Sequence, residues 1–276
     1  MDITDLREKG RLYVTYPREL RDAVEEANAA WVEFCALPEE DKLRFPYSPD
    51  QKTSGNGYEL KKDPATGDLK EDFHFRLNNA DWLRASAHEV DAKVAPAFIE
   101  AALRIPPLMA PILREFAASV EDQLSIEGFE EDVMRVQDDW LVRFLHYFGD
   151  RQPGDVIAAP HVDKGGFTLH LYESAPGVEQ LTYEKEWVDM PLSHDETVII
   201  PATGLQNRTK NALRGTCHRV VALPETAAHG RYSMVSFFNF DRARFYDKRT
   251  HGRLQNFAPG FFYDMPFEEF DKYFVD

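Results

Sequence analysis

Six short runs rich in Val, Ile, Phe and Thr follow one another after Trp140, and they constrain the fold more than any other feature of the chain. They cover residues 141–148, 167–172, 179–183, 196–201, 217–223 and 231–240, and Gly, Pro, Asn and Asp separate them. Strands of this length and spacing are typical of an all-β sandwich or barrel. We therefore expect a β core in the second half of the chain.

The first half has the periodicity of helices. Between Pro17 and about Leu37 apolar side chains recur at helical spacing, and Pro17 stands where a helix can begin. A second helical region is expected over 91–125, with a break at Pro106-Pro107, because proline removes a backbone donor. The polar, glycine-containing stretch 48–68 is expected to be a loop with at most a short strand.

These elements predict a mixed α and β architecture in one compact domain, 1–276. A mainly helical part is expected over 1–135, the β core over 136–245, and a tail with a helix over 246–276. In that tail Phe267, Phe270 and Phe274 lie on one face of the expected helix.

Composition narrows the class of protein. There are 32 Lys and Arg against 48 Asp and Glu, a formal net charge of −16, which disfavours nucleic acid as a partner. The two cysteines, Cys35 and Cys217, imply no disulfide framework. The first residues do not resemble a signal peptide, and no apolar run approaches the roughly 20 residues that span a bilayer. We expect a cytoplasmic protein with no membrane partner, a monomer or weak homo-oligomer.

His161, Asp163 and His218 form a candidate metal site. His161 and Asp163 are two residues apart, so an extended strand would turn both to one face, and His218 follows Asp163 by 55 residues, enough for another strand to return it. Two histidines and a carboxylate on one face of a metal suit an Fe(II) centre that activates O2. The same ligands also serve zinc hydrolases, and such residues often bind no metal.

Arg231 and Ser233 follow on one face of a predicted strand. A guanidinium can hold a carboxylate through two hydrogen bonds, and a neighbouring hydroxyl can add a third. Alone, such an arginine is more often paired with an acidic residue of the protein. After a candidate metal triad, the pair indicates an anion-binding site.

In these segments the chain resembles the isopenicillin N synthase-like branch of the Fe(II)- and 2-oxoglutarate-dependent dioxygenases. The run from His161 matches the family's HTD-x-G-x-x-T-L segment, Thr216-Cys-His218 matches its distal-histidine strand, and Arg231-Tyr-Ser233 matches its R-x-S segment. The stretches 18–45 and 68–75 are similar to the family's leading helix and one of its strands.

The resemblance implies a distorted double-stranded β-helix, or jelly roll, in which His161, Asp163 and His218 are the catalytic residues and bind Fe(II). Arg231 and Ser233 would bind the distal carboxylate of 2-oxoglutarate, a cosubstrate together with O2. Hydroxylation, desaturation or ring closure of a small molecule would follow.

Tyr147 fits the tyrosine of the family's R-x-N-x-Y strand and is expected beside the cosubstrate, with Arg143 as its arginine. The asparagine position is Leu145 here. This departure leaves open an Fe(II) oxidase of the same fold that does not use 2-oxoglutarate, as in isopenicillin N synthase or aminocyclopropane carboxylate oxidase. A non-catalytic barrel that binds metal or a small acid is the alternative from another class.

Five side chains are candidates for substrate contact. Lys164 directly follows Asp163 and could attract an acidic substrate, although a solvated lysine or an internal ion pair is the commoner role of such a residue. His170 and Tyr172 fall on one face of a regular strand, while two more aromatic residues come from regions that border the pocket in relatives: Tyr58 and Phe75.

Overall fold

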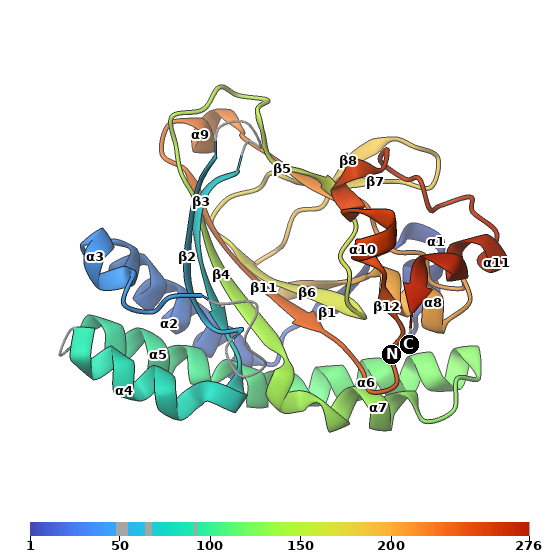
Figure 1. The fold of residues 1–276 in the computed structure, drawn as a ribbon, viewed down its shortest axis with the longest axis horizontal. Coiled ribbons are helices and arrows are strands. Elements are labelled where there is room, and N and C mark those ends of the chain that lie inside the picture. Colours follow the sequence, from blue (N-terminus) through green and yellow to red (C-terminus); the bar gives the residue numbers. More distant parts are fainter. Residues whose placement is uncertain (48–54, 64–67, 91–92, 276) are drawn as a thin grey trace.

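Two antiparallel sheets form the β core. The computed structural model describes residues 1–47, 55–63, 68–90 and 93–275. The larger sheet has seven strands, in the spatial order β1 (Leu12–Thr15), β9 (Glu196–Pro201), β6 (Phe167–Glu173), β11 (Arg231–Phe238), β4 (Leu141–Tyr147), β3 (Asp68–Phe75) and β2 (Gly57–Asp63). The smaller sheet has the order β5 (Val156–His161), β10 (His218–Val221), β7 (Val178–Leu181) and β8 (Trp187–Asp189). The two sheets face each other, as Figure 1 shows.

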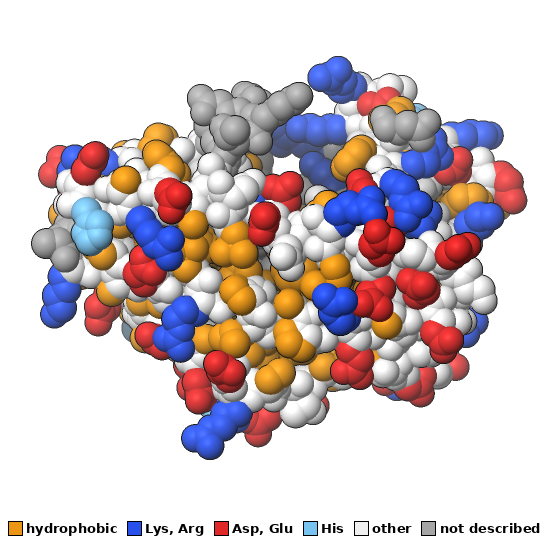
Figure 2. Space-filling model, turned by 90° about the horizontal axis from the view of Figure 1, so that it is seen from below, with side chains coloured by type: hydrophobic (Ala, Val, Ile, Leu, Met, Phe, Trp, Pro, Cys, Tyr) orange, Lys and Arg blue, Asp and Glu red, His pale blue; other side chains and the backbone are white. Residues whose placement is uncertain are grey.

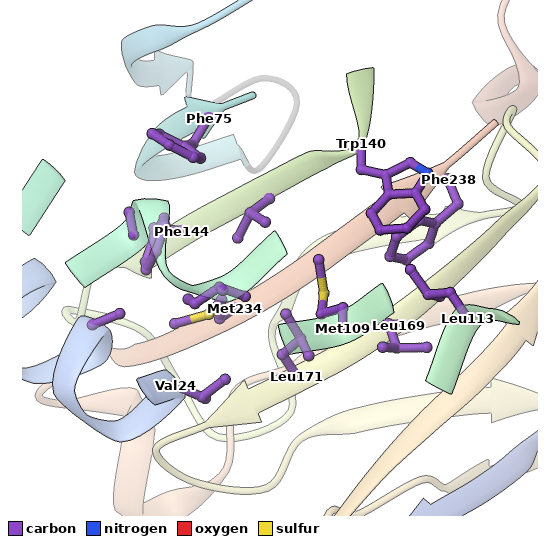
Figure 3. Packing of buried hydrophobic residues seen from close by; sticks show 14 of the residues in the cluster. Val24, Phe75, Met109, Leu113, Trp140, Phe144, Leu169, Leu171, Met234 and Phe238 are labelled. Atoms are coloured by element: carbon purple, nitrogen blue, oxygen red, sulfur yellow. The ribbon is translucent and has the colours of Figure 1, made fainter. Parts of the chain in front are cut away.

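Helices cover the outer face of the larger sheet (Figure 1). They are α2 (Arg18–Cys35), α4 (Ala80–Val90), α5 (Val94–Leu103), α6 (Ile105–Leu124) and α7 (Phe129–Arg135). Their apolar faces and that of the sheet form one core, in which Val24 of α2, Met109 of α6 and Leu171 of β6 converge (Figure 3). Seen from the helical side, charged side chains surround a central group of apolar ones (Figure 2).

Shorter elements connect and close this core. They are α1 (Thr4–Lys9), α3 (Glu39–Lys42), α8 (Thr203–Arg208), α9 (Pro224–Ala227), α10 (Lys248–His251) and α11 (Phe267–Phe270), four single 3-10 turns (Leu77–Asn79, Gln137–Asp139, Leu254–Asn256 and Asp271–Tyr273), and the paired strands β12 (Phe245–Tyr246) and β13 (Phe274–Val275). The turn Leu254–Asn256 contacts β5, so the C-terminal tail lies against the smaller sheet.

The expected β core is confirmed, and three details of the helical half differ. The second helical region breaks at Arg104, while Pro106 and Pro107 lie in the first turn of α6, where the absent amide hydrogens are not needed. The stretch 48–68 contains the seven-residue strand β2, although residues 48–54 and 64–67 of it lie outside the described residues. The helix α4 was not expected.

One helical stretch among the described residues, Val94–Leu124, is long and apolar enough by length and composition to cross a membrane. It comprises α5 and α6, and 56% of its most apolar window is buried within the fold. Its composition is therefore accounted for by packing on the sheet.

β6 carries one extra residue relative to its neighbour β11. Val235 pairs with His170 and Met234 with Tyr172, so Leu171 is a bulge. The bulge shifts the alternation of side chains along the strand. Leu171 and Tyr172 both pack against the helical core, while Glu173 turns inward to face Arg231.

Candidate active site

A cavity lies between the two sheets and is lined by both. It is bounded on the larger sheet by Lys70, Arg143, Leu145, Tyr147, Thr168, His170, Ile200, Ser233, Val235 and Phe237, and elsewhere by Ala158, His161, Asp163, Val178, Met190, His218 and Val220. Apolar walls with a few convergent polar groups are typical of a small-molecule site.

The structure brings His161, Asp163 and His218 together at this cavity. One nitrogen or oxygen atom from each lies within 4.8 Å of the others. His161 Nε2 is 3.6 Å from Asp163 Oδ1, and His218 Nε2 is 4.0 Å from Asp163 Oδ2. Metal–ligand bonds of about 2.1 Å separate neighbouring ligand atoms by about 3 to 4 Å, so the spacing fits one shared ion.

Backbone contacts fix which nitrogen of each histidine faces the other ligands. His161 Nδ1 donates to the carbonyl of Ala159 at 2.8 Å, and His218 Nδ1 donates to that of Thr216 at 3.1 Å. Both Nε2 atoms are left as acceptors for a metal, the arrangement that ligating histidines usually show.

Asp163 is held as a carboxylate. Thr168 Oγ1 donates to Asp163 Oδ2 at 2.6 Å. Burial raises the pKa of Asp163, but its contacts with His161, His218 and Thr168 outweigh burial and keep the pKa well below its usual range. An anionic oxygen therefore completes the donor set, and His161, Asp163 and His218 fit a divalent metal.

Two other groups of potential ligands among the described residues are already satisfied by lysines. Glu71, near Cys35 and His146, is bound by Lys42 at 2.6 Å and lies on the helical side of the sheet. The group Glu59, Asp72 and His74 is bridged by Lys61, which is 3.1 Å from Glu59 and 3.5 Å from Asp72. In both groups the carboxylates already bind lysine side chains, unlike the carboxylate and the two Nε2 atoms of the triad at the cavity.

Ser233 and Tyr147 lie on the cavity wall, and Arg231 lies buried next to them. Arg231 Nη2 donates to Glu173 at 2.7 Å and to the carbonyl of Ala175 at 2.9 Å. Its Nε and Nη1 are buried and have no hydrogen-bond partner among the described residues. The guanidinium therefore keeps one unsatisfied edge, which is what a bound carboxylate would require.

His170 lies at the same end of the cavity as Ser233, with 3.2 Å between His170 Nε2 and Ser233 Oγ. Burial and the nearby charges of Arg231 and His218 lower the pKa of His170 to about 3. The ring is therefore neutral at physiological pH and can exchange hydrogen bonds with Ser233 without adding charge.

Three of the expected substrate contacts are wrong. Tyr58 and Phe75 are buried on the helical side of the larger sheet, where the Tyr58 hydroxyl donates to Glu71 at 2.6 Å. Tyr172 packs against the same core, because the bulge at Leu171 turns it away from His170. Lys164 is exposed and follows Asp163 outside the cavity wall, so its role stays a prediction.

Sequence reasoning missed two residues that hold the site together. Thr168 lies within the matched segment that begins at His161, so its proximity to Asp163 could have been expected from that segment. Glu173 carried no such signal, because regular alternation from Leu169 places it on the outer face.

Comparisons with known proteins agree with this geometry. Residues 138–240 match the model of the 2OG-Fe(II) oxygenase superfamily. Clavatol oxidase claD of Penicillium crustosum is 32% identical over 105 residues, which are 36% of this chain and only 30% of that relative.

Solved structures share the fold over most of the chain. A full-length Neurospora crassa protein, solved in complex with alpha-KG, is 20% identical with a TM-score of 0.69, over 86% of this chain and 77% of that one. The rice dioxygenase for auxin oxidation is 20% identical with a TM-score of 0.65, over 85% and 74%. These likenesses confirm the expected double-stranded β-helix. The segment that matches the 2OG-Fe(II) oxygenase superfamily model, residues 138–240, contains the triad and Arg231.

Proposed function

We propose that the protein is a non-haem Fe(II) oxygenase that couples oxidative decarboxylation of 2-oxoglutarate to oxidation of a small-molecule substrate. The observation that carries the proposal is the triad, whose two free Nε2 atoms and one carboxylate converge at the cavity. His161, Asp163 and His218 would hold the iron, which when bound supplies the oxidising chemistry with O2. The protein's own residues position the reactants and exclude water.

The cosubstrate would bind at the Arg231 end of the cavity. Its distal carboxylate would take the unsatisfied Nε and Nη1 of Arg231, with the hydroxyls of Ser233 and Tyr147 facing the same space. Glu173 would keep Nη2 and so hold the guanidinium in one orientation. The apolar wall around Leu145 would exclude water from the bound molecule.

A second candidate is an oxidase of the same fold that does not use 2-oxoglutarate. Two observations favour it. Leu145 offers no hydrogen bond where the family carries asparagine, and Arg231 already has a carboxylate partner in Glu173. Membership of the isopenicillin N synthase-like branch, a cytoplasmic location, the single-domain division and a monomer or weak homo-oligomer are further proposals that rest on the sequence.

The test is to load the anaerobic protein with Fe(II), add 2-oxoglutarate, and record the visible metal-to-ligand charge-transfer band. The band should form in the wild-type protein and in His88→Ala, a control at an exposed position of α4. It should be absent in His161→Ala and His218→Ala. Tight Fe(II) binding without the band would favour the oxidase, and unchanged Fe(II) binding in both triad variants would refute the metal site.

A further inference from the structure

Two cations line the cavity itself: Lys70, which lies over the ring of Tyr147, and Arg143, which is half-buried and far from Arg231. Tyr147 of β4 pairs with Arg231 of β11, whereas Arg143 pairs with Val235. The second pair lies four residues from the first on both strands. Since a strand rises about 3.4 Å per residue, the two residue pairs lie roughly 14 Å apart along the strands. The cavity thus has one arginine towards each end.

Arg143 lies at the end where the triad is. Its guanidinium stacks 4.8 Å from the centroid of the Phe237 ring. Phe237 pairs with Thr168, whose hydroxyl donates to Asp163. A group bound to Arg143 would therefore be held beside the metal ligands, while the Arg231 end stays available for the cosubstrate.

No acidic side chain forms an ion pair with Arg143 among the residues that the structure describes, and its buried Nε has no hydrogen-bond partner there. Asp72 feels the charge of Arg143, but this carboxylate already binds His74 at 2.7 Å and Lys61 at 3.5 Å. The contact with Phe237 occupies the face of the guanidinium, which leaves its N–H edge free for an anion.

Further cations lie in the chain next to Asp163 and in the C-terminal tail, whose turn Leu254–Asn256 contacts β5, the strand that ends at His161. Lys164, Lys248 and Arg253 are exposed, and none of them forms an ion pair within the described ranges. Lys164 directly follows Asp163, and Arg253 immediately precedes that turn. In a chain of net charge −16, unpaired cations on segments next to the triad favour attraction of an anion.

We infer that the substrate is a small, mainly apolar carboxylic acid whose carboxylate binds Arg143 beside the metal ligands. The walls between the two arginines are apolar and suit the body of such a molecule: Val178, Met190, Ile200, Val220, Val235 and Phe237. Lys164, Lys248 and Arg253 steer the acid to the entrance. The inference rests on the proposed function, because it takes the Arg231 end to be filled by 2-oxoglutarate.

The experiment compares acids with their uncharged amides. Protein loaded with Mn(II), which replaces iron without turnover, is saturated with 2-oxoglutarate and titrated calorimetrically with three matched pairs: phenylacetate and phenylacetamide, 3-phenylpropionate and its amide, hexanoate and its amide. At least one acid should bind ten times more tightly than its amide. Arg143→Gln should abolish that preference, Arg143→Lys should retain part of it, and Arg44→Gln, at an exposed arginine after α3, should leave it unchanged.

Two results would overturn the inference: no acid binds better than its amide, or the preference survives in Arg143→Gln. Binding of 2-oxoglutarate alone, measured by the charge-transfer band of the Fe(II) protein, reports separately on the proposed function. It also shows that each variant is folded, because the Arg231 end does not depend on Arg143. The double variant Lys164→Gln and Lys248→Gln should slow association of the acid with the protein at low salt. It should leave the ratio of acid to amide affinity unchanged.

Discussion

Arg231 and Glu173 form an ion pair that is shielded from water. Their side chains are 0% and 4% exposed, and 2.7 Å separates Nη2 from the carboxylate. Burial raises the pKa of Glu173 despite the neighbouring charge of Arg231. An incoming carboxylate would therefore share a guanidinium that is already neutralised, and Glu173 sets the strength of that binding.

Glu173→Gln should lower stability and strengthen cosubstrate binding. Without the carboxylate the buried charge of Arg231 is uncompensated, which should cost about 1–3 kcal/mol of unfolding free energy. Bound 2-oxoglutarate would restore the balance, so its addition to the Mn(II) protein should raise the melting temperature more in the variant than in the wild type. Glu186→Gln, at an exposed position, is the control. Equal shifts in both proteins would contradict this role of Glu173.

The sequence predicts the grouping of His161, Asp163 and His218 because each residue lies in a local segment whose pattern can be recognised alone. His161 and Asp163 share one strand end, and His218 begins another. Contacts made across the sheet are different. The pairing of Arg231 with Glu173 and the burial of Tyr58 against Glu71 depend on strand neighbours and on a bulge, which no local pattern encodes.

A buried polar network joins α3 to three strands of the larger sheet. Glu71 of β3 accepts hydrogen bonds from Lys42 and from Tyr58, each at 2.6 Å, and His146 Nδ1 lies 2.8 Å from it. Burial raises the pKa of Glu71, but the hydrogen bonds from His146, Lys42 and Tyr58 outweigh burial and lower it to about 2. The charged form of Glu71 therefore stabilises the packing of these elements.

This network should make stability depend on pH in the acid range. A carboxyl whose pKa is lower in the folded than in the unfolded protein stabilises the fold above its unfolded pKa, about 4.3, and loses that contribution as pH falls towards 2. Glu71→Gln should reduce the unfolding free energy at pH 7 by about 1–3 kcal/mol and flatten its fall between pH 5 and 3. Urea unfolding at several pH values measures both effects. Glu268→Gln, at an exposed position, should keep the wild-type slope, and an equally steep slope in Glu71→Gln would assign the acid sensitivity elsewhere.

The helix α2 is anchored to the sheet by Trp31. This fully buried ring lies 5.3 Å from the ring of Phe98, 5.6 Å from Phe34 and 6.1 Å from Phe144 of β4. Trp31→Ala should cost about 3–5 kcal/mol in urea unfolding, because it leaves a cavity among these rings. Val32→Ala, at the next and partly exposed position, should change stability by less than about 0.5 kcal/mol. Similar losses in both variants would show that α2 is not held through Trp31.

Among helices and strands, the periodicity of apolar residues predicted those that are long or that have a regular apolar pattern. The six strand runs and the helix α2 are where the sequence places them. The strand β5 was missed because it is short and contains Ala158, Ala159 and Pro160, which carry little strand preference. The break between α5 and α6 was placed two residues late, because proline is compatible with the first turn of a helix.

The C-terminal tail supports the triad from outside the matched core. Tyr263 accepts a hydrogen bond from the backbone of Cys217 at 2.9 Å and donates one to the carbonyl of Leu181 at 2.8 Å. Cys217 directly precedes His218. Tyr263 thus ties the tail to the strand that carries the second histidine, a link between distant parts of the chain that local patterns could not predict.

Tyr263→Phe should weaken metal binding. The buried amide of Cys217 would lose its partner, so the start of β10 and the orientation of His218 would be less fixed. We expect about tenfold weaker Fe(II) binding in an anaerobic competition with a chelator, as is usual when a residue that orients a metal ligand is replaced. Tyr273→Phe, also in the tail, is the control. Unchanged affinity in Tyr263→Phe would mean that His218 is oriented by its own contact with Thr216 alone.

The bulge at Leu171 inserts one unpaired residue between His170 and Tyr172 of β6. His170 and Glu173 are three residues apart, a separation that turns side chains to opposite faces of a regular strand, yet His170 contacts Ser233 and Glu173 contacts Arg231, both on the inner side of β11. Deletion of Leu171 would leave Tyr172 opposite Met234 and Glu173 opposite Ser233, in the present register. The strand can therefore gain or lose one residue without moving the groups around Arg231, and an alignment of related chains should place a one-residue gap at this position.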